Sequence, residues 1–455
     1  MSFTLKKNFG VTCLCSFFFI VTFLFAGCGS DKESGVDLPK DFRQVAEVAN
    51  EKVNVDIYFD ATVSMKGYTT LSAGNVYRTL PDIFTDIGSS MGEIRFYKFG
   101  AEIAELQNRD YRKYSSPEPY NEKITAVQNV IDKSDTNHLS VIVTDLFESD
   151  SDWSNISKKI REKYFSNHQA VAIIAIKNSF NGDIFDVGLN AAKFNYNSYD
   201  YPDRFRPFYI LVMGQESSIN KFMEKFKERQ TLPNETNYLL LSENLASSTS
   251  NFAKLPVSDL QNFYLNDTLN LEDKGVREFG ADNFNEPASF SVQFDYNPQL
   301  GACPLNFNEM VSDVKIFALE EDEVDESNDE NKDDAEEKKS EKKWQPISSE
   351  GVTVTINPVE GQEKTFTVNV SISPEKNLRE DRLNFVHIAF SPSDKGYLLP
   401  EWVSAWNMAN VDVSQANFDG SKTINLIHVI GSLKDSVFAA AHPSLININF
   451  VVDAR

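Results

Sequence analysis

The chain has 455 residues, of which 41% are hydrophobic and 12% aromatic, so it can bury substantial cores and is long enough for two or three domains. Its formal net charge of −23 excludes nucleic acid and anionic lipid head groups as electrostatic partners. Three of its four cysteines lie within the first 28 residues, which excludes a disulfide framework in the rest of the chain.

The N-terminus carries the pattern of a targeting segment. Lys6 and Lys7 precede an apolar run over residues 11–25, VTCLCSFFFIVTFLF, which is shorter than a membrane-spanning helix requires. Two small residues and Cys28 follow this run. A positive start, an apolar core and small residues before a cleavage point predict a secretory signal, and an uncleaved signal anchor is the alternative.

With its cysteine, this segment resembles a bacterial lipoprotein signal, although Phe25 stands where such signals usually carry leucine. The resemblance implies a signal peptide over residues 1–27, acylation of Cys28 by fatty acids such as palmitate, and a polar tether over residues 28–49. Several acyl chains would anchor the chain stably to a membrane. We therefore expect a protein of the cell envelope, on the outer membrane if the organism has two membranes.

Residues 50–245 alternate apolar strand patterns with helical patterns, which predicts an α/β domain with a doubly wound, mostly parallel sheet. Residues 177–206 form an excursion rich in aromatic residues and asparagine, which is either a protein-recognition surface or a loop folded over its own domain. The expected strands cover residues 53–59, 94–99, 139–143, 170–176, 207–213 and 238–241, and the expected helices cover residues 74–91, 120–131, 152–165 and 217–229.

Oxygen-bearing side chains follow two of the expected strands. Asp60 ends the first strand and is followed by Thr62 and Ser64, and Asp145 ends the third strand. The carboxyl ends of strands in an open α/β sheet lie at one edge, and carboxylate and hydroxyl oxygens are ligands that Mg²⁺ prefers. Thr125 follows a long loop that can reach the same edge. The predicted metal ligands are Asp60, Thr62, Ser64, Thr125 and Asp145.

The first of these segments, DATVS at residues 60–64, resembles the D-x-S-x-S motif of von Willebrand factor type A (vWA) domains, with threonine in place of the first serine. VIVTD at residues 141–145 resembles the family's strand that ends in Thr-Asp, and Leu146 stands where the family usually has glycine. Thr125 is similar in position to the family's hydroxyl ligand, with Thr136 as the alternative.

The resemblance implies a Rossmann-like fold whose metal-ion-dependent adhesion site (MIDAS) binds Mg²⁺, or Mn²⁺ or Ca²⁺ in its place. It also implies a partner protein whose acidic side chain completes the ligand shell. The sequence therefore predicts a metal-dependent protein-binding lipoprotein that is not an enzyme. A metal-free structural scaffold of an envelope complex is the alternative.

A second alternative is a Mg²⁺-dependent phosphatase. The D-x-T pattern after an apolar strand resembles the nucleophile motif of haloacid-dehalogenase-like enzymes, in which Asp145 with Asp150 or Asp152 would bind the metal. Those enzymes carry a second aspartate where this chain has Thr62, and no catalytic lysine is evident. The five histidines are scattered, so nucleophilic hydrolysis has no support either.

Residues 250–455 show strand patterns without helical alternation, which predicts a β-rich, sandwich-like domain. Residues 320–343 form a low-complexity acidic run that cannot bury a core, and we expect a disordered insertion there. Residues 402–442 are less regular, with a helix expected only over 426–441. The expected strands cover residues 288–296, 311–319, 352–356, 365–372, 383–390 and 445–452.

Overall fold

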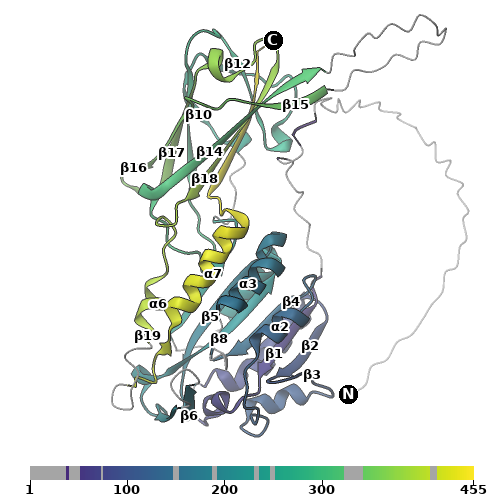
Figure 1. Ribbon diagram of the computed structural model, residues 1–455, viewed down its shortest axis with the longest axis vertical. Helices are drawn as coiled ribbons and strands as arrows, with labels where there is room; N and C mark the ends of the chain where they lie inside the picture. The colour runs from purple at the N-terminus through teal and green to yellow at the C-terminus, as the bar shows by residue number, and fades with distance from the viewer. Residues whose placement is uncertain are drawn as a thin grey trace, which may run out of the picture. The chain divides into compact units, whose positions relative to one another are not determined.

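The computed structural model describes residues 37–39, 42, 52–72, 75–146, 153–186, 192–229, 235–245, 252–321, 342–409 and 418–454. The predicted signal peptide, Cys28 and most of the tether lie outside these residues, as do residues 322–341 of the acidic run. All described helices and strands belong to the unit Leu38–Arg455 (Figure 1). Within the described part of the chain, no helix combines the length and the apolar character that crossing a membrane requires.

A seven-stranded sheet organises the first half of this unit, with the strand order β3-β2-β1-β4-β8-β5-β9. The central strands β1 and β4 are buried along their whole length, as their short β-branched and aromatic runs predict. The mixed α/β class is thereby confirmed. The strands are β1 (Val55–Asp60), β2 (Ile94–Phe99), β3 (Ile103–Glu105), β4 (Leu139–Thr144), β5 (Ala170–Asn178), β8 (Arg206–Gly214) and β9 (Thr236–Leu241).

The prediction of a mostly parallel sheet is wrong. β1 pairs in parallel with β2 and β4, whereas the other four pairings, β2 with β3, β4 with β8, β8 with β5 and β5 with β9, are antiparallel. β2 and β3 are joined by a short connection, and the other antiparallel pairings follow from the connection from β5 to β8, which contains no crossover helix. It contains the hairpin of β6 (Asn181–Asp186) and β7 (Ala192–Asn197), so the chain returns beside β5 in the opposite direction.

Helices cover both faces of the sheet because side chains alternate along its strands. Phe59 of β1 faces Phe84 of α1 (Leu80–Met91), which in turn contacts Phe222 of α4 (Glu216–Glu228). Tyr58 faces the other way, into a core shared with α2 (Val127–Lys133) and α3 (Trp153–Lys163).

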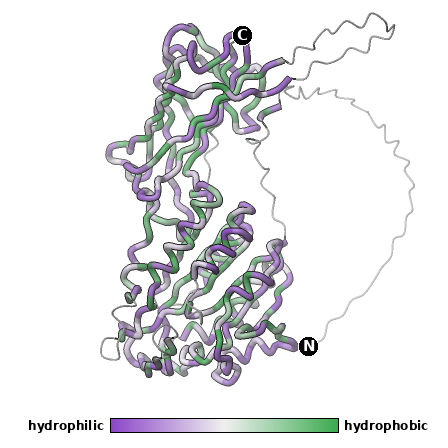
Figure 2. The backbone as a smooth tube through the Cα atoms, in the orientation of Figure 1, coloured by the Kyte–Doolittle hydropathy of each residue, from purple (hydrophilic) through white to green (hydrophobic). Residues whose placement is uncertain are grey.

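Helix α7 (Leu426–Ala441) belongs to the C-terminal half of the sequence but packs alongside α3 on this second face (Figure 1). Its hydrophobic and hydrophilic residues are interspersed along the chain, as an amphipathic helix requires (Figure 2). Leu426, Ile430 and Leu433 are buried on its inner side. The helix expected over residues 426–441 is therefore confirmed.

Two larger sheets form from the C-terminal half, and their inner faces share a core in which the ring centroids of Phe290 and Phe450 lie 5.3 Å apart. One has the order β10-β13-β17-β16 and the other β11-β12-β21-β18-β14-β15. Their strands are β10 (Val257–Gln261), β11 (Phe263–Leu265), β12 (Arg277–Ala281), β13 (Ala288–Asp295), β14 (Met310–Glu321), β15 (Lys342–Ile347), β16 (Thr353–Val359), β17 (Gln362–Ile372), β18 (Leu383–Pro392) and β21 (Ile446–Asp453).

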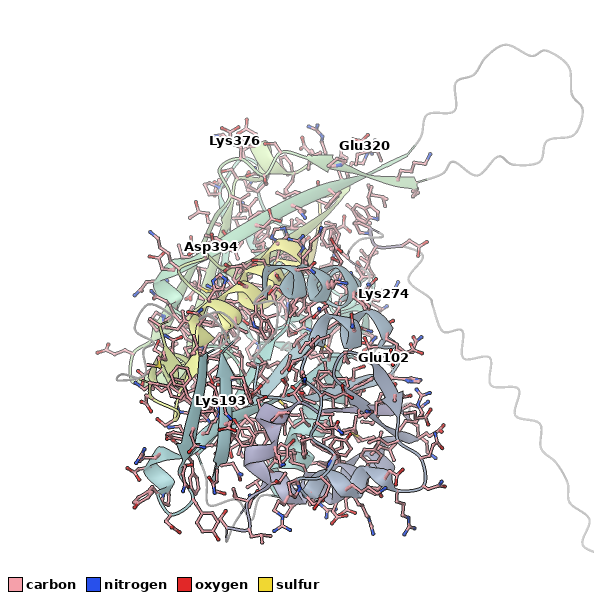
Figure 3. The ribbon with its side chains drawn as sticks, turned by 60° about the horizontal axis from the view of Figure 1, so that its bottom comes forward. Glu102, Lys193, Lys274, Glu320, Lys376 and Asp394 are labelled. Carbon is pink, nitrogen blue, oxygen red and sulfur yellow. The ribbon has the colours of Figure 1, made fainter. Side chains whose placement is uncertain are left out.

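The ends of the acidic run belong to strands and not to the predicted insertion. β14 pairs with β15 in an antiparallel arrangement that places Glu320 opposite Lys343. Opposite charges across a strand pair stabilise it modestly. Glu320 lies on the outside of the molecule like the other charged residues labelled in Figure 3.

Replacing Leu433 by alanine tests the packing of α7. Leu433 is fully buried, so we expect Leu433→Ala to lower the free energy of unfolding by about 2–5 kcal/mol. Ile427→Ala on the same helix is the matched control, because Ile427 is 41% exposed and its truncation should cost less than about 1 kcal/mol. Urea unfolding measures both, and equal effects would contradict the observed packing.

Candidate functional site

Asp60 is the centre of a polar cluster at the carboxyl end of β1. Its side chain is fully buried and accepts hydrogen bonds from the backbone N–H of Thr62 (3.0 Å), from Thr62 Oγ1 (2.7 Å) and from Thr144 Oγ1 (3.0 Å). Thr125 Oγ1 lies 3.4 Å from the second carboxylate oxygen. A buried carboxylate needs such donors because it has lost the hydrogen bonds of water.

The loop after β1 turns the Thr62 and Ser64 hydroxyls toward each other. Their oxygens lie 3.1 Å apart, at the start of the 3-10 helix η2 (Val63–Thr69). Threonine and serine after a strand often cap the next helix, but the Thr62 side chain makes no capping hydrogen bond. Its hydroxyl instead donates a hydrogen bond to Asp60, so Thr62 contributes to the polar cluster and not to a helix cap.

Thr125 reaches the cluster because its loop is tied to the loop after β1. The backbone N–H of Glu122 donates to the carbonyl of Ala61, and the N–H of Val63 donates to the carbonyl of Glu122, both at 3.0 Å. Thr125 Oγ1 consequently lies 3.5 Å from Thr62 Oγ1. Thr136 precedes β4 at the opposite edge of the sheet, so Thr125 is the threonine that the fold brings to the site.

Asp145 follows β4, beside β1, and is also buried. The residue after it, Leu146, has a φ of 60°, which is the left-handed conformation that favours glycine. Leu146 thus adopts the backbone geometry that a glycine would adopt without strain. All five predicted ligands, Asp60, Thr62, Ser64, Thr125 and Asp145, lie at this one edge of the sheet and are buried.

Sequence reasoning missed Arg206, which belongs to the same edge. Arg206 begins β8, and its guanidinium lies 3.9 Å from Asp145 Oδ2, with both side chains 1% exposed. A parallel β8 would have started at the opposite edge, so the expected topology hid this residue. The one sequence feature that could have pointed to Arg206 is its position directly before an apolar strand.

The cluster also shifts the ionisation of Asp60. Burial, and after it the negative charge of Asp145, raise the pKa of this carboxyl from its ordinary 3.8 to about 7. The hydrogen bonds from Thr62 and Thr144 oppose the rise because they stabilise the charged form. A positive charge placed among these oxygens would stabilise the charged carboxylate and so lower this pKa.

The spacing of the hydroxyls fits a small divalent cation. Neighbouring ligands on an octahedral Mg²⁺, with bonds of about 2.1 Å, lie about 3.0 Å apart. Thr62 Oγ1 lies 3.1 Å from Ser64 Oγ and 3.5 Å from Thr125 Oγ1. With Asp60 in hydrogen-bond contact with two of these hydroxyls and Asp145 at the same edge, they form a chemically suitable donor set.

A cavity of about 730 Å³ adjoins the loop that carries these hydroxyls. Val63, between Thr62 and Ser64, forms part of its wall, together with Lys66 and Arg78. Residues 181–183 at the start of β6 form the facing wall, where Gly182 packs against the backbone of Gly67. The described part of the excursion over residues 177–206 therefore packs against its own domain, beside the candidate site.

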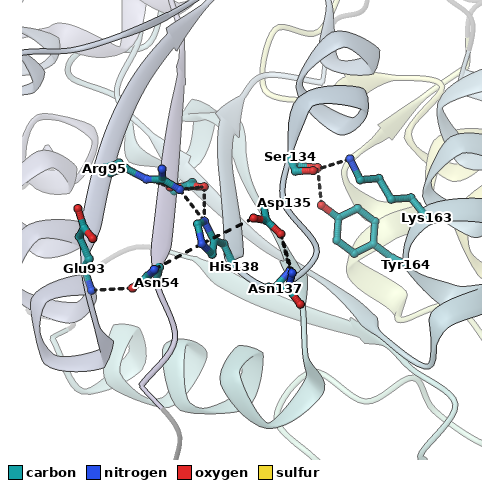
Figure 4. A network of polar contacts seen from close by, with 10 residues as sticks. Asn54, Glu93, Arg95, Ser134, Asp135, Asn137, His138, Lys163 and Tyr164 are labelled. Atoms are coloured by element: carbon teal, nitrogen blue, oxygen red, sulfur yellow. Dashed lines mark hydrogen bonds and ion pairs between the residues drawn. The ribbon is translucent and has the colours of Figure 1, made fainter.

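A separate polar network lies at the opposite, amino-terminal edge of the sheet (Figure 4). Arg95 forms two hydrogen bonds to Asp56, at 2.8 and 3.0 Å, and His138 Nδ1 lies 2.9 Å from the same carboxylate. The network joins β1, β2 and the start of β4. Asp56 and Asp60 are thus two buried carboxylates at opposite ends of one strand, with different partners.

The comparisons with protein-family models and with curated proteins find no match for this chain. Among the described residues, no group of three or more histidine, cysteine, aspartate or glutamate side chains is arranged to hold a metal. The candidate site has a different composition, because it combines two carboxylates with three hydroxyls. Asp150 and Asp152, which the phosphatase alternative requires, lie outside the described residues.

The raised pKa of Asp60 predicts a pH-dependent stability in the absence of divalent cations. The folded protein holds the Asp60 proton more tightly than the unfolded chain, where the pKa is ordinarily 3.8. This contribution to stability is complete below that value and is lost as the pH rises through about 7. We expect the unfolding free energy of the wild type, measured in EDTA, to fall relative to that of Asp60→Asn over this range. A constant difference between the unfolding free energies of the two proteins over this pH range would contradict the prediction.

Proposed function

We propose that this protein is a metal-dependent binding protein of the vWA type, anchored in the bacterial cell envelope by a lipid. The observation that carries the proposal is the convergence of Asp60, Thr62 and Ser64 with Thr125 and Asp145, which come from three separate segments. Such a convergence at the carboxyl edge of an α/β sheet is typical of a binding site.

The order of the elements supports the vWA assignment. A buried strand that ends at Asp60, a helix, a strand pair and a second helix precede β4, which ends at Thr144 directly before Asp145. The left-handed Leu146 supports it further, since the family usually has glycine there. The antiparallel β8 between β4 and β5 distinguishes this chain from a fully parallel arrangement.

The chemistry of the site follows from its donors. Thr62, Ser64 and Thr125 would supply hydroxyl oxygens to Mg²⁺, or to Mn²⁺ or Ca²⁺, while Asp60 and Asp145 supply negative charge. The bound cation would offer a Lewis-acidic position to a carboxylate of a partner protein. The adjoining cavity carries charges of both signs, Lys66 and Arg78 with Glu118 and Asp183, so the preference for an acidic partner rests on the cation alone.

Calorimetric titration of the full chain with Mg²⁺ and Mn²⁺, in detergent, tests the metal site. We expect binding by the wild type and a loss of affinity of about 10- to 100-fold in Asp60→Asn, because the variant removes a buried negative charge. Asp56→Asn is the matched control: it neutralises the buried carboxylate at the other end of β1 and should leave the affinity unchanged.

If the wild type binds neither Mg²⁺ nor Mn²⁺, the proposal of a metal-dependent protein is wrong. Equal losses in the two variants would show that the loss reflects general destabilisation and not ligation. Phosphate release from a model phosphoester, abolished in Asp60→Asn, would instead favour the phosphatase.

The lipid anchor rests on the N-terminal pattern that ends in Cys28. We expect labelled palmitate to be incorporated into the wild type and not into Cys28→Ser. Cys15→Ser, within the apolar run, is the matched control and should keep the label. A wild type that is membrane-bound but takes up no label would favour the uncleaved signal anchor.

The second candidate function is a metal-free scaffold within an envelope complex. Burial of all five proposed ligands favours it, because none of them lines the adjoining cavity through which a partner would approach. In that case the hydroxyls serve the fold by compensating the buried Asp60. The titration above separates the two candidates.

A further inference from the structure

Arg206 is a buried cation at an edge where a metal ion is proposed to bind. Its side chain is 1% exposed and lies 3.9 Å, from Nη2 to Oδ2, from Asp145. Burying a guanidinium costs several kcal/mol unless it is paired, so the fold requires a partner such as Asp145 for Arg206. The antiparallel course of β8 is what brings Arg206 to this edge.

Two further contacts fix the guanidinium beside Asp145. Its Nη1 donates to the carbonyl of Gly420 at 3.2 Å, and its centre lies 5.6 Å from the ring of Phe180. Gly420 is itself closely packed, since a Cβ there would lie 2.4 Å from the ring of Tyr196. The C-terminal half of the chain and the excursion therefore both hold Arg206 in place.

We propose that Arg206 is the internal counter-cation of Asp145 and that it lowers the affinity of the candidate site for divalent cations by competing for this carboxylate. The inference rests on the proposed function, because it concerns the same site. A divalent ion bound beside Asp145 would be repelled by the guanidinium, and buried charges at such distances interact strongly. In the absence of a metal, the same guanidinium neutralises Asp145 and keeps the edge assembled. Arg206 is thus a positioning residue that sets how readily the site takes up its cation.

Neutral and charge-keeping variants of Arg206 separate this role from a purely structural one. We expect the full chain with Arg206→Met or Arg206→Gln to bind Mg²⁺ at least about tenfold more tightly than the wild type, equivalent to about 1.4 kcal/mol. Arg206→Lys keeps the charge and should bind like the wild type. Calorimetry gives the affinities, and thermal unfolding gives a second readout: Mg²⁺ should raise the Tm of the neutral variants more than that of the wild type.

Equal or weaker Mg²⁺ binding by folded neutral variants, beside a wild type that binds, would overturn this inference and leave the proposed function standing. The absence of binding in the wild type and in every variant would overturn both. If the neutral variants do not fold in EDTA, the inference is tested by circular dichroism after refolding with Mg²⁺. Recovery of helical signal supports the role of Arg206 as a substitute for the cation, and no recovery contradicts it.

Discussion

The buried carboxylate of Asp60 is the constraint on which the carboxyl edge of the seven-stranded sheet depends. A charged or polar group that leaves water must be compensated by donors inside the protein. Thr62 provides them from the loop after β1, Thr144 from β4, and Thr125 approaches from the loop before α2. Each donor fixes the segment that carries it, so three segments distant in sequence acquire defined positions through one carboxylate.

The carboxylate of Asp145 adds a second buried negative charge at this edge. Its charge contributes to the raised pKa of Asp60, and Arg206 lies close enough to compensate it. A divalent cation would compensate both carboxylates. The hydroxyls, the guanidinium and the proposed metal are therefore three ways to meet the same electrostatic requirement of buried negative charge.

The two halves of the sequence are joined more closely than their different patterns predict. Helix α7 packs on α3, and Tyr209 of β8 bonds to Thr423 at 2.7 Å, beside the contact of Arg206 with Gly420. The C-terminal half thus supplies both a helix of the α/β layers and part of the surroundings of the candidate site. This arrangement gives the β-rich half a physical route by which to influence the edge that carries Asp145.

The local sequence pattern was sufficient to predict most strands and helices near the site and to place the five oxygen-bearing side chains at one edge of the sheet. Short apolar runs such as LSVIVT dictate buried strands, and the residues that end two parallel neighbours must share an edge. The hairpin β6–β7, the direction of β8 and hence the role of Arg206 were decided only by tertiary structure. Strand direction depends on where the chain returns, and an apolar strand such as PFYILVM reads the same in either direction. The sequence by itself therefore determined which oxygens meet, and the fold alone decided which positive charge lies beside them.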